Sequence, residues 1–412
     1  MKHRSILLSF AEQGFASLAT LAMTVSVIAR SSPEEFGQFS FAFTLVLIAA
    51  SLQYGLVGTS VLVEVRPLDA AGRSQALQTL FAFDFYYRCA AATVIAAALL
   101  VVSHDVILSS AAGIFALTYL WRETTRNALF ATDEAARATA LGTLSFALLM
   151  ALLAATLPSL RSAALAVFIS SALANAAGLG FAAKHFITWP GCPLAAVRTY
   201  RNRFPMTGWI LANSAANEAQ TRAHVLALQL FRGADQLGII EAARVLFAPL
   251  LLISAAWQRV AQPQLASLVA DGKHDAARRL TLVGVAIVGG IALLYSAIVY
   301  IVYDYLAPRL FGNRFGDVSS YAAAWAICST LILANWTLIS FMNAIRAFRR
   351  VAVVVAVAAA STLLLLLLLA FDVPLILALV IPILVQAAVF VTLFASLWVA
   401  APVENARGAG RL

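Results

Sequence analysis

Few charged residues lie inside the long apolar segments of the sequence, and most of these fall in pairs at helical spacing. Residues three or four positions apart meet on one face of a helix, so an acid and a base at this spacing can pair. A charge at the centre of a bilayer costs at least about 2.5–3.5 kcal/mol, so each such residue needs a reason. These residues are the pairs Asp84–Arg88, Glu218–Arg222 and Glu241–Arg244, and the single acid Glu12.

The arginines predict a site for an anion. The guanidinium group keeps its charge and donates two parallel hydrogen bonds to one phosphate group. We therefore expect Arg88, Arg222 and Arg244 to line a cavity and to offer positive charge to an anionic substrate. Arg259 lies on the same helix face as Glu241 and Arg244 and joins this set. The alternative is structural, with each pair neutralising itself and holding the helices together.

The acids predict a site for a coupling ion. A carboxylate in a low-dielectric cavity can load and release a proton near neutral pH. The candidates for this role are Glu12, Glu218, Glu241 and Asp84.

Uncharged polar residues form one narrow stripe in each half of the chain. In both stripes the spacing is four, three and four positions, which keeps the side chains on one helix face. A polar stripe should avoid lipid, so the two stripes predict a shared cavity, or alternatively hydrogen-bonded seams between helices. The stripes are Gln13, Ser17, Thr20 and Thr24, and, about 200 positions later, Asn213, Asn217, Gln220 and His224.

The elements that carry these residues are transmembrane helices. Of the 412 residues, 62% are hydrophobic and only 11% are charged, and the mean hydropathy is +0.89. A span needs about 20 apolar residues, so we expect about twelve spans. The expected spans are 6–29, 38–63, 76–101, 106–127, 137–157, 162–182, 206–230, 237–258, 281–303, 318–341, 350–371 and 375–400.

The basic residues indicate topology and not nucleic-acid binding. Most of the 28 lysines and arginines lie in the two tails and in every second loop, which is the bias expected of cytoplasmic segments. We expect both termini in the cytoplasm. The basic residues are not gathered with aromatic residues on one face, so nucleic acid is not an expected partner.

The chain repeats itself, which predicts two lobes. Arg30-Ser-Ser-Pro-Glu-Glu-Phe-Gly37 and Arg232-Gly-Ala-Asp-Gln-Leu-Gly238 occupy equivalent loops. Parallel repeats of this kind are a common transporter architecture. The predicted parts are an N-terminal six-helix lobe 1–183, a basic cytoplasmic linker 184–204, a C-terminal six-helix lobe 205–400 and a cytoplasmic tail 401–412.

No catalytic or cofactor motif is present. The sequence has no phosphate-binding glycine loop, no metal-ligand spacing of Cys or His, and no Gly-x-Ser-x-Gly motif. We therefore expect no enzyme activity, no cofactor and no metal. Energy for any transport would come from an ion gradient, the membrane potential or another subunit.

Several segments resemble the polysaccharide transporters, which are lipid-linked oligosaccharide (O-antigen, Wzx-type) flippases of the multidrug/oligosaccharidyl-lipid/polysaccharide (MOP, MATE-like) exporter superfamily. They are Ile28–Gly37 with Gly55-Leu56, Gly233–Leu246 with Gln262–Ala266, and Leu310–Phe315. The resemblance implies an all-α membrane protein whose two pseudo-symmetric six-helix lobes alternate between inward- and outward-facing states.

The resemblance also implies the activity. The substrate would be an undecaprenyl-diphosphate-linked oligosaccharide, flipped across the inner membrane for surface polysaccharide or exopolysaccharide biosynthesis. Expected partners are this lipid-linked glycan, membrane lipid, and a polysaccharide polymerase and glycosyltransferases. Two alternatives stay open: a cation-coupled MATE-like exporter of small molecules, and a non-transporting scaffold of a glycan assembly complex.

Overall fold

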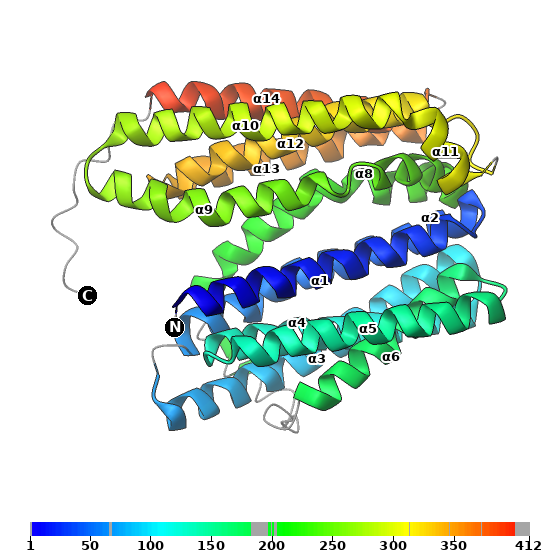
Figure 1. Cartoon of the computed structure of the whole chain (residues 1–412), viewed down its shortest axis with the longest axis horizontal. Helices are drawn as coiled ribbons and strands as arrows, with labels where there is room; N and C mark the ends of the chain where they lie inside the picture. The colour runs from blue at the N-terminus through cyan, green and yellow to red at the C-terminus, as the bar shows by residue number, and fades with distance from the viewer. Residues whose placement is uncertain are drawn as a thin grey trace. The chain divides into compact units, whose positions relative to one another are not determined.

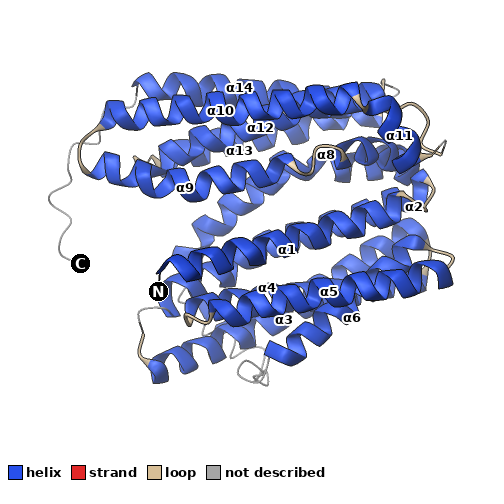
Figure 2. Ribbon diagram, viewed as in Figure 1, coloured by secondary structure: helices blue, strands red, loops and turns tan. Residues whose placement is uncertain are grey.

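The computed structural model describes residues 2–65, 68–182, 197–198, 200–201, 204–312, 314–345, 347–371 and 373–399. These residues form helices joined by short turns, with no strand among them (Figure 2). Most of the predicted linker 184–204 and all of the predicted tail 401–412 lie outside them. The contacts divide the chain into a first unit, Met1–Glu218 with Arg232–Ile239, and a second unit, Ala219–Phe231 with Ile240–Leu412.

The first unit is built around helix α4. This helix packs against α3 on one side and α6 on another, while α5 packs against both α1 and α6 (Figure 1). The unit's long helices are α1 (Lys2–Ile28), α2 (Pro33–Gln53), α3 (Ala70–Ser103), α4 (Val106–Ala131), α5 (Ala135–Ser159) and α6 (Ala163–Ala182). Helix α2 continues into two π-helical segments, Tyr54–Gly58 and Val61–Val65.

Short polar side chains start three of these helices. The Ser32 hydroxyl accepts a hydrogen bond from the Glu35 N–H, with Pro33 as the first residue of α2. Asp69 caps α3 and Asp105 caps α4 in the same way. A capping oxygen satisfies an N–H that the helix itself leaves unpaired. These caps separate apolar segments that would otherwise run together.

The second unit is built around helix α12. It packs against α14, α10 and α9, and Figure 1 shows α10, α12 and α14 side by side. The helices are α9 (Leu250–Ala270), α10 (His274–Ile301), α11 (Tyr303–Phe311), α12 (Ser319–Ala344), α13 (Phe348–Leu366) and α14 (Leu377–Val399). The short helix α11 was not expected from the sequence.

Helix α8 (Phe204–Val245) is two helices joined at Gly233. Gly233 has φ 84° and ψ 173°, a conformation that only glycine adopts readily. The predicted span 237–258 is not one continuous helix either. A turn separates the end of α8 at Val245 from the start of α9 at Leu250. Pro249 lies in this turn and has no N–H to continue a helix. Helix α9 then extends to Ala270, well beyond the predicted end.

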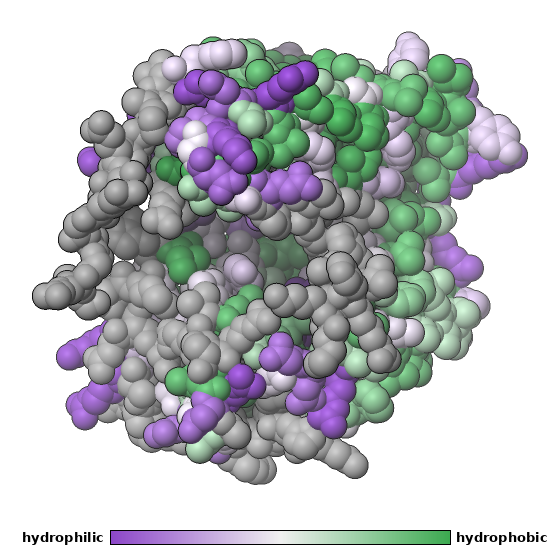
Figure 3. All heavy atoms as spheres, turned by 60° about the vertical axis from the view of Figure 1, so that its left-hand side comes forward, coloured by the Kyte–Doolittle hydropathy of each residue, from purple (hydrophilic) through white to green (hydrophobic). Residues whose placement is uncertain are grey.

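Nine helices among the described residues are long and apolar enough to cross a membrane. The long helices outside this set are α4, α8 and α9, and both α4 and α8 carry clusters of charge. On the face shown in Figure 3, hydrophobic side chains form broad continuous areas and hydrophilic ones gather in separate groups. The apolar surface suits a lipid environment, and the charged residues of α4 and α8 are therefore the candidates for a functional site.

Candidate functional site

Three predicted site residues meet in the second unit. The Nε2 atom of His224 lies 3.2 Å from Glu241 Oε1, and Arg244 forms an ion pair of 2.6 Å with Glu241 Oε2. Trp325 of α12 covers the group, with its ring 5.3 Å from the His224 ring and 5.9 Å from the Arg244 guanidinium. The pair Glu241–Arg244 follows from helical spacing, but His224 and Trp325 join it only through the fold.

Burial is unequal across this cluster, and the inequality matters for binding. The side chains of His224 and Glu241 are 3% and 1% exposed, whereas that of Arg244 is 36% exposed. Glu241 is thus held by two partners inside the unit, and the arginine reaches outward from it. A guanidinium group has five N–H donors, so one carboxylate does not use them all. The arrangement presents a positioned positive charge.

A helix break fixes the position of Arg244. This residue lies in the last turn of α8, where a cation is favoured by the helix dipole. The turn before Pro249 leaves the Leu246 carbonyl without a helical partner, and the Tyr295 hydroxyl of α10 donates to it at 2.8 Å. The Trp325 indole N–H donates to the Ile240 carbonyl at 3.1 Å. Neighbouring helices therefore hold the broken end of α8 in place.

Asp84 and Arg88 form a second cluster, in the first unit. Arg88 Nε lies 2.9 Å from Asp84 Oδ2, and the Gln53 amide donates to Asp84 Oδ1 at 2.6 Å. The Trp121 ring lies 5.0 Å from the guanidinium. Asp84 is 0% and Arg88 is 4% exposed. A fully buried pair with a third hydrogen-bonding partner favours the structural alternative for these two residues.

Glu12 belongs to a third cluster, whose other members we did not predict. Glu12 lies 3.4 Å from Arg126, which also binds Glu123 at 2.7 Å, and Arg122 lies 3.3 Å from Glu123. The Arg122 guanidinium also donates to Asn175 Oδ1 at 3.2 Å.

In the topology predicted from the sequence, Arg122 and Arg126 lie at the cytoplasmic end of span 106–127. In the structure α4 continues to Ala131, and Arg122 is buried. The signal in the sequence was the acid Glu123 between them, which offered a partner within one helical turn.

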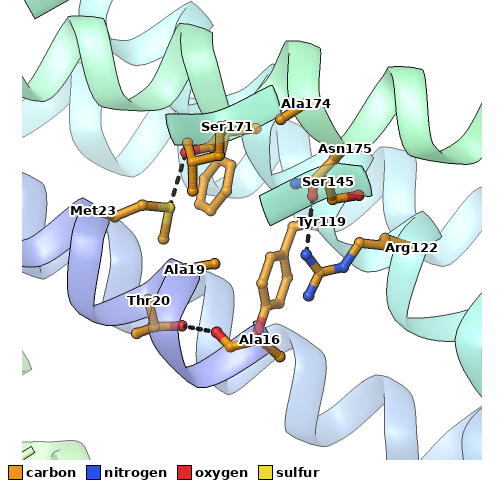
Figure 4. Close-up of a pocket in the computed structure, with 12 residues that line it drawn as sticks. Ala16, Ala19, Thr20, Met23, Tyr119, Arg122, Ser145, Ser171, Ala174 and Asn175 are labelled. Atoms are coloured by element: carbon orange, nitrogen blue, oxygen red, sulfur yellow. Dashed lines mark hydrogen bonds between the residues drawn. The ribbon is translucent and has the colours of Figure 1, made fainter. Parts of the chain in front are cut away.

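The first polar stripe lies along α1 and is half-buried throughout. Thr20 donates to the Ala16 carbonyl and Thr24 to the Thr20 carbonyl, so both hydroxyls bond to their own helix. Thr20 lines a pocket within the first unit, together with residues of α4, α5 and α6 (Figure 4). Gln13 and Ser17 lie nearer the start of the helix.

The second stripe changes from exposed to buried along α8. Asn213 is exposed and Asn217 is half-buried, whereas Gln220 and His224 are buried. Of the remaining candidates, Glu218 is buried and Arg222 is half-buried. The prediction that Arg259 shares a helix face with Glu241 and Arg244 is wrong, because the turn before Leu250 places Arg259 on α9. Its side chain lies outside what the structure describes. A cavity shared by the two stripes stays a prediction.

In the described part of the chain, no group of three or more His, Cys, Asp or Glu side chains could hold a metal ion. The described charge clusters instead combine arginine with carboxylate, which is suited to binding or structure.

Comparison with solved structures identifies the fold. The chain is similar to an inward-facing multidrug resistance MATE family transporter of the MOP superfamily (TM-score 0.65, 12% identity, 93% of this chain and 94% of the other). It is also similar to the lipid II flippase MurJ in an inward closed conformation (TM-score 0.69, 10% identity, 95% and 87%).

A third similar structure is a MOP superfamily transporter from Pyrococcus furiosus Vc1, for which a reversed polarity of the binding pocket suggests a different function (TM-score 0.59, 10% identity, 96% and 94%). No family model and no curated protein matches the sequence. The structural likeness confirms the predicted all-α, multi-pass membrane fold of the MATE/MOP type.

Proposed function

We propose that this protein flips a lipid-linked glycan, of the undecaprenyl-diphosphate type, across the bacterial inner membrane with both termini in the cytoplasm. The observation that carries the proposal is the Glu241–Arg244 pair, in which a buried acid and a helix break hold a partly exposed arginine. Neither the sugars nor the diphosphate of such a substrate can enter lipid unaided, and the diphosphate is the charged part. A positioned guanidinium group compensates its charge.

Arg222 extends this site in the proposal. It lies on α8 two positions before His224, in the same unit as Glu241 and Arg244. A guanidinium group suits a diphosphate better than it suits an organic cation, because like charges repel. The sugars would occupy the polar surroundings of the stripes, and the isoprenoid chain would stay in lipid. Glu12, Glu218 and Glu241 remain the candidates for ion coupling.

The test in cells uses two substitutions and one control. Arg222→Ala and Arg244→Ala should each lower surface glycan at unchanged protein level, since each removes a charge proposed to hold the diphosphate. Arg137→Ala is the control, because Arg137 forms an exposed ion pair with Glu134. Normal glycan in both site variants would overturn the assignment.

The same cells distinguish the alternatives. Altered drug susceptibility with unaltered glycan would identify a cation-coupled exporter of small molecules. Loss of polymerase or glycosyltransferase recruitment in the site variants, with no flipping by the wild type in reconstituted vesicles, would identify a scaffold. The MATE and MurJ likenesses concern the fold, which the exporter and the flippase share.

A further inference from the structure

A small pocket within the first unit lies outside the group of arginines proposed to hold the diphosphate. Four helices line it: α1 through Thr20, α4 through Arg122, α5 through Ser145 and α6 through Ser171 and Asn175. The space holds about one or two water-sized molecules, so its ligand must be small. The pocket belongs to the first unit, whereas Glu241 and Arg244 belong to the second.

The polar groups of this pocket are mainly hydrogen-bond donors. Arg122 contributes a guanidinium group, and none of the described residues that line the pocket is Asp or Glu. Asn175 Oδ1 already accepts from Arg122, which leaves the Asn175 amide hydrogens for a ligand. The Ser171 hydroxyl is directed at the Met23 sulfur, at 2.9 Å. Figure 4 shows Arg122 and Asn175 pointing toward one another beside the ring of Tyr119.

The Ser145 hydroxyl is a second indication that the pocket binds a ligand, and it does not depend on Arg122. The Ser145 side chain is 3% exposed, and its hydroxyl oxygen has no hydrogen-bond partner among the described residues. A buried hydroxyl without a partner is costly in an apolar interior. An acceptor in the pocket would satisfy it.

We propose that this pocket binds a halide-sized anion, held by the Arg122 guanidinium and the Ser145 hydroxyl. The surrounding charge sets the strength of binding. Arg122 and Arg126 balance Glu12 and Glu123, so the empty cluster is neutral and an added anion leaves one uncompensated negative charge. Glu12 has the weakest contact of the four, a single approach of 3.4 Å to Arg126.

Glu12 is therefore the residue whose charge controls the anion. Among the described residues, the charged groups that face it belong to α4: Arg126, Glu123 and Arg122. Helix α5 presents the uncharged Gly142, where a Cβ atom would lie 3.3 Å from Glu12 Cγ. If the Glu12 charge is removed, the cluster becomes positive and an anion restores neutrality. Binding should then be stronger.

The experiment measures chloride directly, as the ³⁵Cl NMR line broadening caused by the purified full-length protein in detergent. The wild type should show saturable broadening. Arg122→Gln should weaken chloride binding by about tenfold or more, and Ser145→Ala by about threefold or more, because each loses a hydrogen bond to a charged ligand. Glu12→Gln should strengthen it. Arg137→Gln, an exposed arginine of α5, is the control and should leave it unchanged.

The result that would overturn the proposal is equally specific. No saturable broadening in the wild type would show that the pocket holds only water. Broadening unaffected by Arg122→Gln would place the anion elsewhere. If Arg122→Gln does not fold, Ser145→Ala and Glu12→Gln decide the question, and weaker or unchanged binding in Glu12→Gln contradicts the proposed charge balance.

Discussion

Gly37 and Gly238 lie face to face within the first unit, where two helices cross with their backbones in contact. A Cβ atom on Gly37 would lie 1.8 Å from the Ala234 carbonyl oxygen, and one on Gly238 would lie 1.8 Å from the Pro33 carbonyl oxygen. These glycines end the two repeated loop motifs, about 200 positions apart. The repeat read from the sequence thus meets itself at equivalent residues, as expected of parallel repeats related by an axis.

The crossing makes a strong prediction for stability. Gly37→Ala and Gly238→Ala should each destabilise the protein by about 2 kcal/mol or more, because backbone atoms must move apart to admit a methyl group. The matched control is Gly14→Ala, also in the first unit, where a Cβ atom would meet nothing within 4 Å. Alanine favours helix there, so the control should be neutral or slightly stabilising. Thermal unfolding in detergent measures all three, and equal melting temperatures would contradict the crossing.

The buried pair of Asp84 and Arg88 should be structural. Asp84→Ala or Arg88→Ala alone should cost about 3–5 kcal/mol, because each leaves an unpaired charge inside the unit. The double variant should cost clearly less than the sum of the two. As the control pair, Glu134 and Arg137 are exposed and should contribute about 0–1 kcal/mol.

A double-mutant cycle on each pair makes this measurement. Additive losses at Asp84 and Arg88 would contradict the structural role. In that case Arg88 would again be a candidate for binding the substrate.

The hydrogen bond from Tyr295 to Leu246 should hold the broken helix end. Tyr295→Phe should lower the free energy of unfolding by about 1–3 kcal/mol, because the carbonyl loses its donor. It should also lower glycan output, since Arg244 lies two positions before Leu246. Tyr300→Phe is the control on the same helix, because Tyr300 is 76% exposed. Equal stability and output in the two variants would show that the turn does not depend on Tyr295.

Local relations were predictable from the sequence, and distant ones were not. Helical spacing alone predicts the pairs Asp84–Arg88 and Glu241–Arg244, because both partners lie on one helix face. It could not place Gln53 on Asp84 or Trp325 on Arg244, since those contacts depend on how helices pack.

The predictions that differ from the structure also have physical explanations. Arg122 and Arg126 looked like loop residues because apolar content falls near the end of α4, yet the helix continues and their acid partners lie beside them. Ala248-Pro249 did mark a break, but the apolar residues on both sides concealed it. The stripe residues could be assigned to one helix face, but their neighbours could not.

Whether the protein flips a lipid-linked glycan can be measured directly in proteoliposomes that contain a fluorescent undecaprenyl-diphosphate-linked sugar. A membrane-impermeant quencher reports the share of headgroups on each side. We expect the wild type to flip the headgroup. Arg244→Gln should lower the rate by about tenfold or more, because a charge-assisted contact to phosphate is removed. Arg309→Gln should keep the wild-type rate, since the Arg309 guanidinium lies over Tyr305 in α11. Equal flipping by wild type and Arg244→Gln, or no flipping at all, would contradict the proposed function.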